Sequence, residues 1–173
     1  MYLVSAYFDE QSNRTLQGYI NKIAEYSGNS FMIDNTVPPH LTISSIEARS
    51  VDELRDAFIS AINKLSPGEI IIPTLGQLFP YVVYGGVVLN DYLQNMQKII
   101  YDEISVIPGI SVNRYYMPNS WIPHVTLAKT LKNEQMRIAF EIMQKTFNPV
   151  RGKVVEIGLA QTNPHEDILR MKL

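Results

Sequence analysis

The chain has 173 residues, of which 46% are hydrophobic and 18% charged, and it contains no cysteine. These values predict one domain, residues 1–173, and exclude a disulfide framework, thiolate catalysis and Cys-ligated zinc. A net charge of −2 excludes a broad basic surface that holds long nucleic acid by counterion release, so any RNA contact must be local. The N-terminus lacks a basic leader and no apolar run is long enough to span a bilayer, so we expect a cytoplasmic protein without membrane contact and, by default, a monomer.

Apolar residues at alternating or helical spacing, bounded by Gly, Pro, Asn and Asp, predict strands and helices along the whole chain. In chain order we expect a strand at 2–8, a helix at 12–26, a strand at 40–46, a helix at 52–65, a hairpin of strands at 69–79 and 81–89 around Pro80, a helix at 92–106 capped by Asn90 or Asp91, a strand at 121–129, a helix at 133–147, and strands at 150–161 and 168–173. Residues 110–120 fit either a strand or a loop. The order predicts an α+β protein.

The two halves of the chain share a coarse pattern. Residues 39–65 and 123–147 both begin with Pro-His-x-Thr, continue as a strand and lead into an amphipathic helix. No Pro-, Gly- or Ser-rich linker separates the halves, so the pattern indicates a weak internal duplication within one domain.

Two of the three histidines open nearly the same short sequence, Pro39-His40-Leu41-Thr42-Ile43 and Pro123-His124-Val125-Thr126-Leu127. With the eight threonines of this chain, two such His-x-Thr matches would arise by chance in about 0.6% of cases. On a strand, residues i and i+2 share a face, so each histidine lies beside its threonine while the apolar residues point to the core.

Two imidazoles that face one phosphate can hold opposite protonation states near neutral pH, so that one activates water and the other protonates the leaving oxygen. Threonine hydroxyls are neutral donors that can orient phosphate oxygens. The repeated motif therefore predicts acid–base chemistry by His40 and His124, with Thr42 and Thr126 as ligands of the phosphate.

The paired motifs, and above all Trp121-Ile122-Pro123-His124-Val125-Thr126-Leu127-Ala128, resemble the two-histidine (2H) phosphoesterase superfamily, which includes the 2'-5' RNA ligase-like cyclic phosphodiesterases. The resemblance implies a bilobal, pseudo-twofold fold with two antiparallel sheets flanking a central cleft and helices outside. It also implies metal-independent hydrolysis of 2',3'-cyclic phosphates of nucleotides or RNA ends, without a cofactor. His40 would be the acid and His124 the base.

This sequence departs from the family at two places. Lys129 stands where relatives often have arginine, and Ser44-Ser45 follow the first motif where a basic residue is expected. Lysine lacks the bidentate fork that suits phosphate oxygens. Both changes weaken the case for an extended RNA substrate.

Other interpretations stay open at this point. The chain could be a non-catalytic module that binds a nucleotide or RNA terminus, or it could join RNA ends, and a lone histidine is usually structural. A closed zinc site lacks a suitably spaced set of ligands. Further candidates are residues for base stacking (Tyr81, Tyr84, Tyr115, Tyr116 and Trp121) and cations for phosphate (Arg49, Arg114 and Lys129). Lys129 falls on the opposite strand face from His124, and His165 is expected in a surface loop.

Overall fold

The computed structural model describes residues 1–162 and 166–173, so the expectation for His165 lies outside the described residues. The elements are β1 (Tyr2–Phe8), α1 (Glu10–Ser27), α2 (Phe31–Asp34), β2 (Leu41–Glu47), α3 (Asp52–Ile62), β3 (Gly68–Ile72), β4 (Thr74–Leu78), β5 (Val82–Gly86), α4 (Asp91–Ser105), β6 (Ser111–Val112), a 3₁₀ turn (Arg114–Tyr116), β7 (His124–Ala128), α5 (Asn133–Thr146), β8 (Val150–Gln161) and β9 (Glu166–Lys172). The α+β class is confirmed. The short helix α2 lies between the predicted helix at 12–26 and the predicted strand at 40–46, where no element was predicted.

Within the described residues, nine strands form one curled antiparallel sheet in the order β3-β8-β1-β2-β7-β5-β4, with β6 beside β2 and β9 beside β8. The family resemblance implied two sheets. In the structure the two halves form one sheet, because β2 pairs with β7 at Leu41 and Val125. β8 is long enough to pair with β3 along its first part and with β9 along the rest.

The predicted hairpin is only half correct. β4 and β5 do pair, from Thr74 opposite Gly86 to Leu78 opposite Val82. However, β3 ends before Pro73 and pairs with β8 at the other end of the sheet. Proline has no N–H to donate to a ladder, so Pro73 divides the apolar run into two strands with different partners.

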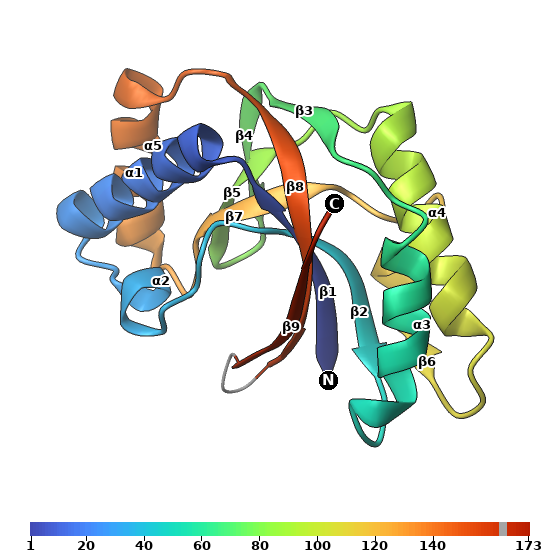
Figure 1. Ribbon diagram of the computed structural model, residues 1–173. Coiled ribbons are helices and arrows are strands. Elements are labelled where there is room, and N and C mark those ends of the chain that lie inside the picture. The colour runs from blue at the N-terminus through green and yellow to red at the C-terminus, as the bar shows by residue number, and fades with distance from the viewer. Residues whose placement is uncertain (163–165) are drawn as a thin grey trace.

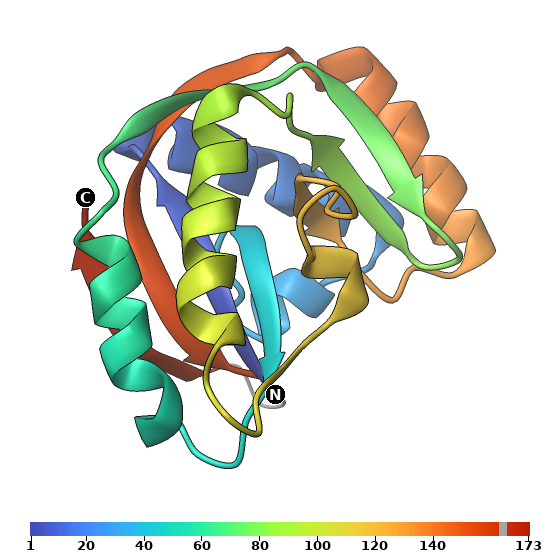
Figure 2. The same cartoon turned by 90° about the vertical axis from the view of Figure 1, so that its right-hand side faces the viewer.

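The helices pack as two pairs at the two sides of the sheet. α1 lies against α5 and α3 against α4, as Figures 1 and 2 show. Asp9 caps α1 by accepting a hydrogen bond from the Ser12 N–H at 2.9 Å, and Gly28 ends the helix in the left-handed region at φ 68°. The predicted cap of α4 by Asn90 is also present, with a 3.0 Å bond from the Leu93 N–H. No helix in the described part of the chain is long and apolar enough to cross a membrane.

Candidate active site

The two motif strands meet through their apolar middle residues. β2 and β7 run antiparallel, and Leu41 lies directly opposite Val125. Both side chains are fully buried, as are Ile43 and Leu127 two positions further along each strand. One face of this strand pair is therefore core, and the other carries the polar residues of the motifs.

The register brings the four predicted site residues onto that polar face. Counting outward from the Leu41–Val125 pair, His40 falls opposite Thr126 and Thr42 opposite His124. Opposed residues of an antiparallel pair share a face. Each histidine is thus a cross-strand neighbour of the other motif's threonine, in a pseudo-twofold arrangement around the central pair. We call this face the His–Thr face.

Both imidazoles are held in the same way by the backbone. Nδ1 of His40 lies 2.8 Å from the Pro38 carbonyl, and Nδ1 of His124 lies 2.8 Å from the Ile122 carbonyl. A carbonyl can only accept, so Nδ1 carries the hydrogen in both rings and Nε2 is the nitrogen that can take up a proton. In each motif the acceptor is two residues before the histidine, and an intervening proline supplies no competing N–H.

A tyrosine from a neighbouring strand packs against each histidine. The Tyr84 ring on β5 contacts His124 edge-on at 5.3 Å between ring centres, and the Tyr7 ring on β1 lies 6.4 Å from that of His40. Tyr84 was a sequence candidate for base stacking, whereas Tyr7 was expected only as part of a buried strand. The alternation of Ser5 and Tyr7 with apolar Val4, Ala6 and Phe8 was the signal that could have placed it on the polar face.

The environment of His124 shifts its pKa. Burial lowers the pKa of His124 below its ordinary value, and this outweighs the opposite effect of its bond to the Ile122 carbonyl. His124 is therefore biased toward the neutral imidazole, which is the form that a general base requires.

Trp121 makes a second link between the motif strands. Its ring is buried, and its Nε1–H donates a 3.0 Å hydrogen bond to the backbone carbonyl of Thr42. A residue just before β7 is thereby fastened to the middle of the first motif. The buried ring leaves little surface for stacking on a base, which was the role considered from sequence.

The other sequence candidates make contacts with residues outside the two motifs. The Lys129 ammonium lies 5.8 Å from the centre of the Phe31 ring on α2, which agrees with the prediction that Lys129 points away from His124. Arg114 stacks on the exposed ring of Tyr115 at 4.8 Å. The remaining three are Arg49, which is exposed, Tyr81, which is exposed beside the β4–β5 turn, and Tyr116, whose carbonyl accepts a bond from Gln97. Ser44 and Ser45, which replace the expected basic residue, are buried.

One cation near the motifs was missed in the sequence. Arg170 on β9 places its guanidinium carbon 3.7 Å from the centre of the Tyr7 ring. It is paired with Asp167 at 2.7 Å and with Glu156 at 3.4 Å. Nothing in the local sequence around position 170 marks it, because β1, β8 and β9 come together only in the folded sheet.

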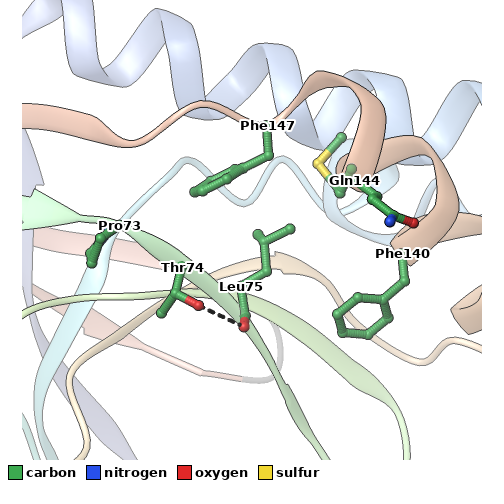
Figure 3. A pocket seen from close by; sticks show the side chains of 7 residues that line it. Pro73, Thr74, Leu75, Phe140, Gln144 and Phe147 are labelled. Atoms are coloured by element: carbon green, nitrogen blue, oxygen red, sulfur yellow. Dashed lines mark hydrogen bonds between the residues drawn. The ribbon is translucent and has the colours of Figure 1, made fainter.

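The pocket between β4 and α5 is separate from the His–Thr face. Figure 3 shows it lined by Leu75, Phe140 and Phe147, with Pro73 and Thr74 at one side. None of its lining residues is a histidine or a carboxylate, so it offers no group for acid–base chemistry. Among the described residues, no group of three or more His, Asp or Glu side chains is arranged to hold a metal ion.

No protein-family model matches the sequence, and no curated protein matches it. Solved structures do match. The crystal structure of E. coli LigT complexed with 3'-AMP has a TM-score of 0.67 at 15% identity, over 99% of this chain and 97% of that one. A phosphoesterase crystal structure has a TM-score of 0.65 at 14% identity, with the same coverage, and the Thermus thermophilus protein TT0787 has 0.64 at 14% identity, also with 99% and 97% covered. The chain therefore has the fold of the LigT-like phosphoesterases, as the resemblance of its motifs implied.

Proposed function

We propose that this protein is a metal-independent cyclic phosphodiesterase that hydrolyses 2',3'-cyclic phosphates of nucleotides or RNA ends. The observation that carries the proposal is the antiparallel pairing of the two His-x-Thr motifs through Leu41 and Val125. It gives two identically held imidazoles and two hydroxyls on one sheet face. The fold likeness to E. coli LigT, whose structure holds 3'-AMP, supports a nucleotide as the ligand class.

In the proposed reaction, His124 acts as the base and His40 as the acid. Nε2 of His124 takes a proton from water as the water oxygen bonds to phosphorus. The bond from phosphorus to one ribose oxygen breaks, and that oxygen receives the Nε2 proton of His40. The product is a 2'- or 3'-monophosphate, and the two histidines end with exchanged protonation states.

The lowered pKa of His124 supports this division of roles, because a neutral imidazole is ready to accept a proton at neutral pH. Thr42 and Thr126 are assigned to the phosphate oxygens, whose negative charge grows in the transition state. Hydroxyl donors stabilise that charge without forcing both imidazoles to stay protonated.

The test is release of monophosphate from nucleoside 2',3'-cyclic phosphates by wild type, His40→Ala and His124→Ala. Each variant is expected to lose about 10²- to 10⁴-fold in kcat, and the double variant little more, since the two groups act as a unit. Equal background rates in all three proteins would favour a non-catalytic binding module instead.

Thr42→Val and Thr126→Val are expected to lower kcat/KM about 10- to 100-fold, as for lost hydrogen bonds to a charged group. Thr74→Val is the matched control, because Thr74 lies exposed on β4 beside a different pocket. Activity is expected to persist in EDTA. Loss of activity in EDTA that a divalent ion restores would refute the metal-independent reaction.

A further inference from the structure

The stack of Arg170 on Tyr7 lies on the His–Thr face. Ser5 on β1 is directly opposite Thr42 on β2, and it is also directly opposite Gly158 on β8, which in turn faces Arg170 on β9. Since opposed residues share a face, Thr42, Ser5, Gly158 and Arg170 all lie on the same face of the sheet. Figure 1 shows β2, β1, β8 and β9 following one another in the curled sheet.

Gly158 makes the stack possible. A Cβ atom at this position would lie 2.7 Å from Cε2 of Tyr7 and 3.3 Å from Cγ of Arg170. The first distance is a clash and the second is a tight contact. The absence of a side chain on β8 therefore lets the Arg170 side chain cross that strand and reach the Tyr7 ring on β1.

Tyr7 connects the stack to the proposed acid. One ring contact joins it to His40, at 6.4 Å between centres, and the other joins it to the Arg170 guanidinium, at 3.7 Å. Its hydroxyl donates to Asp167 at 3.3 Å, and burial raises the pKa of the phenol well above its ordinary range, so that the ring stays neutral. The guanidinium is thus one aromatic ring away from the proposed reaction centre.

The partners of Arg170 decide what it can bind. Its edge already donates to Asp167 and Glu156, so a phosphate at the same donors would have to compete with two carboxylates. One planar face is covered by Tyr7, yet 35% of the side chain remains exposed. A guanidinium plane held in this way is suited to stacking on a flat aromatic ligand.

We propose that the Tyr7–Arg170 stack is the nucleobase subsite of this protein, with the face of the Arg170 guanidinium that is turned away from Tyr7 stacking on the base of the cyclic nucleotide. The inference rests on the proposed function, because the ligand is the substrate of that reaction. It assigns binding of the phosphate to the motif residues and binding of the base to β1, β8 and β9.

The test compares a substrate that has a base with one that lacks it. For adenosine 2',3'-cyclic phosphate, Arg170→Ala is expected to raise KM on the order of tenfold, the usual scale of one lost base stack. For ribose 2,3-cyclic phosphate without a base, the same variant should leave KM unchanged. Arg170→Lys keeps the positive charge but removes the planar guanidinium, so its KM values should match those of Arg170→Ala.

Arg137→Ala is the matched control, because Arg137 also pairs with two carboxylates, Glu134 and Glu141, but on the exposed surface of α5. Gly158→Ala is a second probe that leaves both stacked residues in the chain, and its added Cβ should raise the KM for the adenosine substrate as well. Thermal unfolding of each variant should be measured to check that it is folded at the assay temperature.

A binding measurement separates this proposal from the reaction itself. Adenosine 3'-monophosphate should bind wild type and His124→Ala about tenfold more tightly than their Arg170→Ala counterparts, whether or not any cyclic phosphate is hydrolysed. Unchanged affinity in Arg170→Ala would overturn the subsite. So would an equal loss of affinity for inorganic phosphate, which would make Arg170 a ligand of the anion.

Discussion

Replacing Trp121 by phenylalanine tests how the two halves of the sheet are held in register. The change removes the Nε1–H that donates to the buried carbonyl of Thr42 at 3.0 Å. Leaving that carbonyl without this donor costs about 1–3 kcal/mol, and the smaller ring forfeits roughly 1 kcal/mol of apolar burial. We expect the free energy of unfolding to fall by about 2–4 kcal/mol.

Trp121→Phe should also lower activity in the folded protein, beyond any loss caused by unfolding. β2 and β7 pair directly only at Leu41 and Val125, so the Trp121 bond is a second constraint on the distance between the motifs. Without it, the two imidazoles should be less well placed for the proposed reaction at one phosphate. Small displacements of catalytic groups cost large factors in rate. We expect kcat/KM to fall at least tenfold at a temperature where the variant is fully folded.

Tyr19→Phe is the matched control. The Tyr19 hydroxyl donates to the Asn148 carbonyl and accepts from the Asn148 N–H, both at 3.1 Å, between α1 and the segment that follows α5. Stability is measured by urea unfolding, where the urea midpoints can be compared if the dependence of the unfolding free energy on urea is unchanged. Both variants should show a similar loss of stability. Only Trp121→Phe should lose activity. Full activity in Trp121→Phe, or equal losses in the two variants, would refute the reasoning.

The remaining predictions concern pH and the start of α1. Because burial lowers the pKa of the proposed base His124, the acidic limb of kcat/KM should have its midpoint below the ordinary histidine value of 6.5, and a midpoint above it would contradict the assignment. Burial alone would raise the pKa of Asp9, but bonds from Ser12 and Lys153 lower it. Asp9→Ala should cost about 1–2 kcal/mol at pH 7 by chemical denaturation. The stability difference between wild type and Asp9→Ala should vanish as the pH falls through the pKa of Asp9 in the folded protein. A carboxyl with a lowered pKa stabilises the fold only at pH values where it is ionised. Gly152→Ala should cost at least as much, because its Cβ would lie 1.8 Å from Oγ of Ser12, and an unchanged stability would contradict the close packing of β8 against this cap.

Local sequence signals were sufficient for most of the elements. β1 and β8 have the predicted bounds, because alternating apolar residues bounded by turn residues specify a strand wherever it is paired. Asn90 caps α4, as one of the two predicted candidates, and a glycine, Gly28, ends α1, since caps depend on nearest neighbours alone. The division of the run 69–79 at Pro73 was missed, although the proline itself was a usable signal.

Partner choice was beyond local signals. β3 and β4 are separated by a single residue and lie at opposite ends of the sheet. The pairing of a strand depends on which distant segment completes its ladder and covers its apolar face, and neither is encoded in the strand's own pattern. The same limit applies to the contact of Arg170 with Tyr7 across Gly158, because these residues come from three strands that meet only in the fold.

The sequence by itself determined the chemistry that the site can offer, because a repeated His-x-Thr on a strand puts an imidazole and a hydroxyl on one face by the period of two. Only the tertiary structure decided how the copies meet. The Leu41–Val125 pair sets the antiparallel register that crosses each histidine with the other threonine. The curled sheet then brings β8 and β9 alongside β1, and this supplies the Arg170 stack. Register and curvature arise from packing between segments far apart in the chain, so no local pattern could specify them.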